Sequence, residues 1–239
     1  MAKVVGLIGS AKGKIGNTVF VVRRGTQISR VYQPSVHNPK SKRQELSRAK
    51  MAAAVAGLKP LTRALRAGWS QLVPGYEFQK AISIAIPANN LIITQIDPLT
   101  PPRLQMSALA PLMSASQLAR PASTGAAFEV ESTVKYTISV PESAFYDEEG
   151  SSIGCGVVTV VINPAAEDAH VDFHALTAGS SNVNVSVSVP EAWSGMEVVV
   201  YCFLKQIPEA SNGMQSNTYP WMFPAKTSGT LYLGEGTIA

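Results

Sequence analysis

The feature that most constrains the fold is a series of short, valine-rich segments in which apolar and polar residues alternate. They follow one another after Pro74-Gly75 and are bounded by Pro, Gly or Asn. Such alternation is typical of half-buried strands, and seven or eight such segments predict an immunoglobulin-like β-sandwich. The predicted strands span 80–86, 90–96, 128–140, 153–162, 170–177, 182–189, 196–206 and 230–238.

The first 75 residues differ from this β-rich body, which we place at 76–239. Residues 17–24 and 26–32 alternate like strands and are joined at Arg24-Gly25, so they predict a β-hairpin. Between about 97 and 127 the body contains a Pro/Ser/Met-rich stretch without alternation, which predicts a long surface excursion. The predicted fold class is mainly β, an immunoglobulin-like β-sandwich preceded by a basic β-hairpin and an α-helical segment.

Residues 42–67 predict a helix, because apolar side chains recur at helical spacing. Ser41 and Gln44 have the spacing of a capping box at its start, and Pro60 is expected to kink it or to start a second helix. A stripe of large side chains is expected to dock the helix onto the body or onto a neighbouring subunit. Its members are Met51, Val55, Leu58, Leu65 and Trp69.

Charge is segregated along the chain. Residues 1–66 contain 14 Lys or Arg and one acid, Glu45, whereas residues 121–239 contain three Lys and 13 acids. The formal net charge of +4 hides this separation. One carboxylate cannot compensate so many cations, so we expect the front segment to bind a negative partner. Nucleic acid is the first candidate, an acidic protein face is the second, and plain solvation of the charges is the third.

The candidate binding residues are cations of the hairpin and of the start of the helix. Aromatic residues are sparse in this region, which argues against base stacking and favours phosphate contacts that do not depend on nucleotide sequence. The candidates are Lys12, Lys14, Arg23, Arg24, Arg30, Lys42, Arg43 and Arg48.

Catalytic motifs are incomplete. Residues 9–14 are similar to a phosphate-binding loop, but Ile8 and Ile15 occupy the positions of its first Gly and of its Ser or Thr. The chain has three histidines and no nucleophile elbow around a serine. We therefore expect no enzymatic activity and no cofactor.

Two side-chain sets are weak candidates for a metal or redox site. His170, Asp172 and His174 share one face of a predicted strand, as metal ligands would, but an ordinary solvent-facing side has the same alternation. Cys155 and Cys202 are similar to the inter-sheet cysteines of an immunoglobulin domain. Because the chain shows no export signal, we expect both thiols to be buried and reduced. No metal site is predicted.

Two further patterns bear on location and on internal symmetry. No stretch of about 18 apolar residues exists, so no membrane span is expected, and the apolar start is too short for a signal peptide. Ser139-Val140-Pro141-Glu142 recurs as Ser188-Val189-Pro190-Glu191, each followed by a loop and a valine-rich strand. The repeat is consistent with related hairpins within one sandwich.

Several short motifs occur together in a fixed order. They are Gly13-Lys14-Ile15-Gly16-Asn17, Val21-Val22-Arg23-Arg24-Gly25, Asn38-Pro39-Lys40, Gln44, Arg48-Ala49-Lys50, Leu58-Lys59-Pro60-Leu61, Gly68-Trp69, Val189-Pro190-Glu191-Ala192-Trp193-Ser194-Gly195, Val199-Val200-Tyr201-Cys202-Phe203 and Ser228-Gly229-Thr230-Leu231-Tyr232-Leu233-Gly234. In this order the chain resembles an uncharacterised domain-of-unknown-function family of gut-type bacteria and their phages. The resemblance implies a two-part protein encoded in phage or prophage settings, with no assigned reaction.

Taken together, these features favour a non-enzymatic phage virion or assembly protein. We expect a homo-oligomer whose basic front contacts genomic nucleic acid or the acidic inner face of a shell, with other virion proteins as partners. It would be made in the host cytoplasm and reside in the virion. The alternatives are a cytoplasmic nucleoid-type nucleic-acid-binding protein and a surface or adhesive β-sandwich protein.

Overall fold

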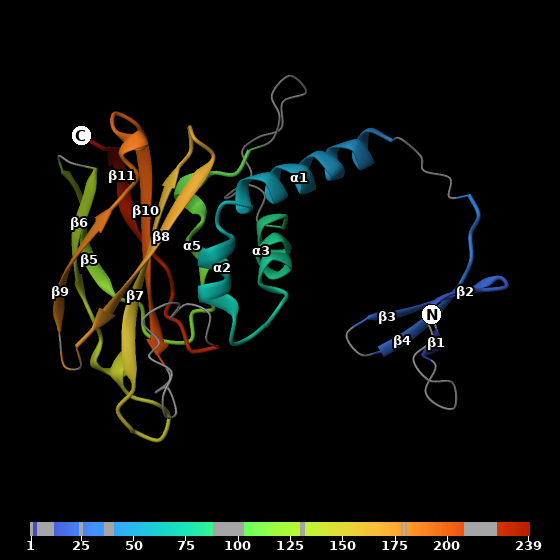
Figure 1. The fold of residues 1–239 in the computed structure, drawn as a ribbon, viewed down its shortest axis with the longest axis horizontal. Helices are drawn as coiled ribbons and strands as arrows, with labels where there is room; N and C mark the ends of the chain where they lie inside the picture. Colours follow the sequence, from blue (N-terminus) through green and yellow to red (C-terminus); the bar gives the residue numbers. More distant parts are fainter. Residues whose placement is uncertain are drawn as a thin grey trace. The chain divides into compact units, whose positions relative to one another are not determined.

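The computed structural model describes residues 2–3, 12–23, 26–35, 41–87, 103–129, 132–177, 179, 181–207 and 224–239. Within them the chain is mainly β, with strands in three sheets and several helices (Figure 1). It divides into two compact units, Met1–Glu45 and Leu46–Ala239. The division falls inside α1 (Lys42–Leu58), so most of this helix belongs to the second unit and not to a basic arm that ends at residue 75.

The first unit contains a four-stranded antiparallel sheet in the order β1-β4-β3-β2. Its strands are β1 (Ala2–Lys3), β2 (Gly13–Ile15), β3 (Thr18–Arg23) and β4 (Thr26–Val31). β3 and β4 form the predicted hairpin, with Thr18 opposite Val31 and Arg23 opposite Thr26. Gly16 has φ 58° in the turn between β2 and β3, a conformation that favours glycine.

The second unit has two sheets. One has the order β5-β6-β9 and the other has the order β11-β10-β7-β8. The strands are β5 (Ala122–Glu129), β6 (Thr133–Ser139), β7 (Gly154–Asn163), β8 (Asp168–Leu176), β9 (Asn182–Ser188), β10 (Glu197–Ile207) and β11 (Leu231–Thr237). The helices are α2 (Thr62–Trp69), α3 (Glu77–Ala85), η1 (Met106–Ala108), α5 (Ala110–Met113), η2 (Glu142–Phe145) and η3 (Glu191–Trp193).

The strands β7 and β10 are buried on both faces, because they lie between two hydrophobic layers. Val157 and Cys202 pack in one cluster with side chains of β6 and β9. Val158, Val160 and Phe203 pack in a second cluster with side chains of α2, α3 and α5. Figure 1 shows these helices on the side of the β11-β10-β7-β8 sheet that faces away from β5-β6-β9. A strand buried on both sides is expected to be apolar almost throughout, as β7 and β10 are.

Most of the predicted strands are confirmed, and two segments are corrected. Strands β7, β8, β9, β10 and β11 lie within about two residues of their predicted bounds. The predicted strand 128–140 is the end of β5 followed by β6, with Ser132 at φ 53° between them. The predicted strand 80–86 is instead part of helix α3, whose Ala81 and Ala85 are buried one turn apart. The predicted strand 90–96 lies outside the described residues.

The predicted surface excursion at 97–127 is also wrong for its described part. Residues 103–127 include η1, α5 and most of β5, and Leu109, Leu112 and Met113 have no exposed surface. These side chains belong to the cluster that joins the helices to the sheet. The search for alternating apolar residues did not identify this segment as part of the core. The segment enters the core through short helical turns and not through a strand.

Hydrogen bonds between the helices and the sheet explain the motif Gly68-Trp69. The Trp69 indole Nε1 donates to Leu112 O at 2.7 Å, and Gly68 O accepts from Thr227 Oγ1 at 3.0 Å. A Cβ added at Gly68 would lie 1.7 Å from Met113 O, so only glycine allows this approach. The motif therefore has a structural role at the end of α2.

The two cysteines lie on neighbouring strands of one sheet. Cys155 of β7 and Cys202 of β10 are both free and fully buried. Burial raises the pKa of each thiol to about 12. Because both cysteines lie in one sheet, the inter-sheet bridge considered from the sequence is wrong, and their predicted burial is confirmed.

The repeated Ser-Val-Pro-Glu sequence marks two equivalent crossings. After β6 the chain passes through η2 into β7, and after β9 it passes through η3 into β10. Each crossing leaves the sheet β5-β6-β9 for the other sheet and buries an aromatic residue, Phe145 or Trp193. The sequence repeat is thus matched by a structural one.

Candidate nucleic-acid interface

The β2-β3-β4 sheet gathers three of the candidate cations on one face. In an antiparallel sheet, directly opposite residues share a face and successive residues alternate between faces. Lys14 is opposite Val19, and Val19 is opposite Arg30, so the two cations flank a valine in one row across three strands. Arg23 lies further along β3 on the same face. We call this side, with Lys14, Val19, Val21, Arg23, Thr26, Ile28 and Arg30, the basic face.

The cations of the basic face are open to solvent, and no carboxylate is near them in the sequence. Lys14, Arg23 and Arg30 are exposed, and residues 12–35 contain no Asp or Glu. Lys14 Nζ lies 3.5 Å from the centre of the Tyr32 ring, a cation–π contact that leaves its charge uncompensated. A salt bridge far along the chain joins Lys226 to Glu148, where the ammonium lowers the pKa of the carboxyl.

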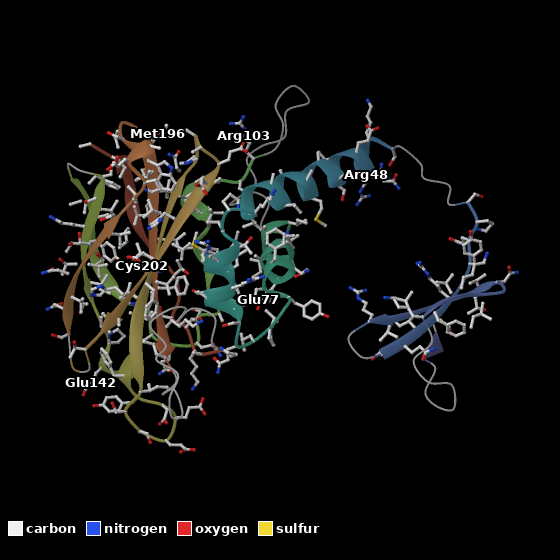
Figure 2. The ribbon with its side chains drawn as sticks, in the orientation of Figure 1. Arg48, Glu77, Arg103, Glu142, Met196 and Cys202 are labelled. Atoms are coloured by element: carbon white, nitrogen blue, oxygen red, sulfur yellow. The ribbon has the colours of Figure 1, made fainter. Side chains whose placement is uncertain are left out.

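The remaining candidate cations do not all join this face. Lys12 is exposed just before β2, and Arg24 lies outside the described residues. Lys42, Arg43 and Arg48 are exposed on α1. At about 100° per residue they point to three different sides of the helix, so α1 presents no single basic face. Figure 2 labels Arg48 on this helix.

The start of α1 is capped, although only half of the predicted capping box forms. The Gln44 N–H donates to Ser41 Oγ at 3.4 Å, a long contact. The Gln44 Oε1 is buried without a hydrogen-bond partner, so the return half of the box is missing.

The predicted docking stripe is buried only in its second half. Leu58, Leu65 and Trp69 are at most 6% exposed and lie in the cluster beneath the helices, whereas Met51 and Val55 are 46% and 40% exposed. Met51 and Val55 therefore do not pack on the body in the single chain, and their docking onto a neighbouring subunit stays a prediction. The large side chains of this half of α1 face solvent, and Ala54 supplies the buried contact instead.

The body contains one buried cation that the sequence analysis did not single out. Lys205 of β10 is completely buried, and its Nζ donates to Ala67 O at 2.9 Å and to Ser70 Oγ at 3.4 Å. An ammonium here binds a carbonyl at the C-terminal end of α2, where the helix dipole favours a cation. Burial lowers the pKa of Lys205 to about 8. In the sequence, the position of Lys205 inside an apolar strand was the signal that could have identified it as a buried cation.

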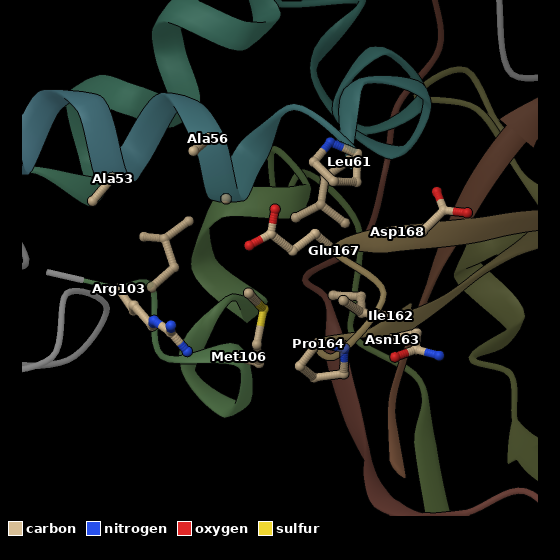
Figure 3. Close-up of a pocket in the computed structure, with 13 residues that line it drawn as sticks. Ala53, Ala56, Leu61, Arg103, Met106, Ile162, Asn163, Pro164, Glu167 and Asp168 are labelled. Atoms are coloured by element: carbon tan, nitrogen blue, oxygen red, sulfur yellow. The ribbon is translucent and has the colours of Figure 1, made fainter. Parts of the chain in front are cut away.

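A cavity of about 340 Å³ lies between the end of α1 and the β7–β8 turn. Ala53, Gly57 and Leu61 form part of its apolar wall, and Figure 3 shows Arg103 and Glu167 entering it from different segments. Its size suits a small ligand. The lining contains no Ser, Cys, His, Lys or Tyr, and its ionisable side chains are Arg103, Glu167 and Asp168.

The metal set considered from the sequence is not assembled. Along β8, His170 and Asp172 are half-buried and His174 is exposed. In the part of the chain that the structure describes, no three His, Cys, Asp or Glu side chains are grouped to hold a metal ion. Within the same residues, no helix is long and apolar enough to cross a bilayer.

Fold and site together define a class of protein with a small basic sheet and a separate, mainly β body whose second sheet carries helices. The chain belongs to a family of unknown function (DUF6266), whose model matches residues 10–214. This match covers most of both units and agrees with the predicted resemblance to an uncharacterised domain family. No curated protein matches the sequence.

Proposed function

We propose that this chain is a non-enzymatic structural or assembly protein of a phage particle, in which the basic N-terminal region contacts nucleic acid or an acidic shell face. The observation that carries the proposal is the basic face. Lys14, Arg23 and Arg30 share one exposed side of a sheet, and residues 12–35 contain no acid. Cations arranged in this way gain most from an external polyanion, because contact with phosphates releases condensed counterions.

The distribution of charge in the body supports a directional contact. The acids of residues 121–239 outnumber the lysines by 13 to three. Exposed acids occupy both ends of the body, for example Glu142 after β6 and Glu197 at the start of β10. Figure 2 marks these ends by Glu142 and the neighbouring Met196. The body repels a polyanion while the N-terminal unit attracts it, so nucleic acid is held from one side.

The character of the basic face favours phosphates over bases. Its side chains are Lys, Arg, Val, Ile and Thr, and the one ring near it, Tyr32, is already in contact with Lys14. Sequence-tolerant stacking uses several exposed aromatic rings, whereas this face has one partly exposed ring beside it, Tyr32, which already contacts Lys14. Binding is therefore expected to be independent of nucleotide sequence.

The non-enzymatic character is proposed from the sequence and from the cavity. Histidines are few and no nucleophile elbow occurs, and the cavity lining has no Ser, Cys, His or Lys. We propose no cofactor for this protein.

We further propose that the body is an immunoglobulin-like sandwich. In order along the chain, its first, second and fifth strands form one sheet, and its third, fourth, sixth and seventh strands form the other. Immunoglobulin constant domains have the same division except that the fourth strand joins the first sheet. Such sandwiches serve as interaction modules on many unrelated proteins, which fits an assembly role.

The phage setting, the virion location and synthesis in the host cytoplasm rest on the family resemblance. Partners would be copies of this chain and other virion proteins. Two rivals predict different behaviour. A nucleoid-type protein would bind duplex DNA and be missing from particles, and a surface adhesin would be exported. Mass spectrometry of purified phage particles separates them, because a virion protein must copurify in a fixed ratio to the shell.

The contact surface is tested with the full chain and a fluorescent duplex. The variant Lys14→Glu/Arg23→Glu/Arg30→Glu should bind at low salt on the order of 100-fold more weakly than wild type. A matched control changes the same number of exposed cations in the second unit, Arg63→Glu/Lys80→Glu/Arg120→Glu, and should lose much less. Equal losses for the two variants would show that net charge, and not the basic face, determines binding.

A further inference from the structure

The sheet of the first unit has two chemically different sides. Opposite the basic face lie Gly13, Ile15, Thr18, Phe20, Val22, Gln27, Ser29 and Val31, which we call the neutral face. None of these side chains carries a charge. Ile15, Thr18 and Val31 form one row across three strands, because Thr18 is opposite both of the others.

The neutral face is open in the single chain. Ile15 is 65% exposed, Val22 is 40% exposed and Val31 is 75% exposed. No side chain between residues 12 and 35 that the structure describes is buried. A sheet normally buries one face against a second layer, and a unit of this size has little other means of gaining stability. Three β-branched residues on one open face therefore mark a surface that gains from being covered.

We infer that the neutral face binds the neutral face of a second copy of this chain. Charge argues for this occupant. The body is acidic, so it would be attracted to the basic face and not to the neutral one. Two neutral faces can pair without placing like charges together. A two-fold axis would pair the same patch on both copies, as is usual for dimers. Both basic faces would then point outward, on opposite sides of the pair.

The area of the face predicts how strong this pairing is. β3 and β4 have six residues each, whereas β1 has two and β2 has three. With a rise of about 3.4 Å per residue and a strand spacing of about 4.8 Å, the face covers on the order of 300 Å² per copy. The total of about 600 Å² lies at the small end of protein interfaces, where association is weak or transient. The dimer should therefore form weakly in free solution and more strongly when both copies are held on one polyanion. The inference rests on the proposed function only in assuming that copies assemble.

The test measures association of the full chain without nucleic acid, by sedimentation equilibrium up to about 1 mM protein. Wild type should show a monomer–dimer equilibrium that strengthens with salt, because screening reduces repulsion between the cationic units. The variant Ile15→Lys/Val31→Lys should weaken it at least tenfold. Both positions are exposed, and far-ultraviolet circular dichroism checks that the fold is retained.

A matched control places the same change on the other side of the sheet. Val19→Lys/Val21→Lys should leave the dimer constant within about twofold and tighten duplex binding. A wild-type chain that stays monomeric would overturn the inference, and so would a dimer that the neutral-face variant leaves intact. A dimer that forms through this face but binds no duplex would uphold the inference and remove nucleic acid from the proposed function, leaving the acidic shell face as the partner.

Discussion

At the residue scale, the end of α2 is the point where small changes should have the largest effect. Gly68 of α2 lies against the backbone of Met113 because it has no side chain. Lys205 of β10 donates from its buried ammonium to Ala67 O, near the end of the same helix. Neither position is part of the candidate interface. Their substitution therefore tests the account of the fold separately from the account of function.

Replacing Gly68 with Ala should strongly destabilise the protein. The new Cβ would lie 1.7 Å from Met113 O, so the helix or the α5 segment must shift. We expect a loss of about 3 kcal/mol or more in the free energy of unfolding, measured in urea. Arg63→Ala, on the exposed side of the same helix, should stay within about 0.5 kcal/mol. Equal effects would refute the close approach at Gly68.

The buried ammonium of Lys205 should make stability depend on pH. Its pKa falls from 10.5 in the reference state to about 8 in the fold. Between these values the unfolded chain binds a proton that the folded chain has lost, so stability from this group rises with pH. Relative to Lys205→Met, wild type should gain on the order of 2 kcal/mol between pH 8 and 10.

The pH prediction is a difference between two proteins, so contributions from other groups cancel. Burial also raises the pKa values of Cys155, Cys202 and the buried tyrosines, which would lower stability at high pH in both proteins. Urea unfolding of the pair at several pH values measures the difference. A gap that does not change with pH would mean that Lys205 is not desolvated.

At the element scale, the sequence predicted strands well and helices less well, for identifiable reasons. Strands β7 and β10 have long apolar runs bounded by turns, and they were found. Helix α3 was missed because its sequence also alternates, and the deciding signal was the i, i+4 pair of small residues Ala81 and Ala85. Met51 and Val55 satisfied the helical period, but the period does not state which side of α1 meets the body.

The two crossings between the sheets are the elements whose packing is easiest to test. Trp193 in η3 is 4% exposed and lies in the core between the two sheets. Trp193→Ala should therefore cost about 3–5 kcal/mol of unfolding free energy, because it leaves a large cavity. Tyr146→Ala, 43% exposed beside the other crossing, should cost below about 1 kcal/mol. Thermal or urea denaturation gives both values, and a small effect at Trp193 would contradict the packing.

At the scale of the whole molecule, the sequence was enough to locate the basic N-terminal segment, whereas the boundary between the two compact units needed the structure. The cluster of basic residues was visible from counts alone, but its arrangement as Lys14, Arg23 and Arg30 on one face needed the strand register. The unit boundary at Glu45 was not visible, because α1 continues through it without a break in helical periodicity. Identification of the neutral face also needed the strand register, because the valines of β3 lie on both sides of the sheet.

The central claim is that the basic N-terminal region binds a polyanion through phosphate contacts. Its most direct test is the salt dependence of duplex binding by the full chain. With on the order of six contacts, a plot of log affinity against log salt should fall with a slope of about −5. The Lys14→Glu/Arg23→Glu/Arg30→Glu variant should flatten that slope by about 3. An affinity for the wild-type chain that stays constant between about 50 and 200 mM salt would contradict the claim.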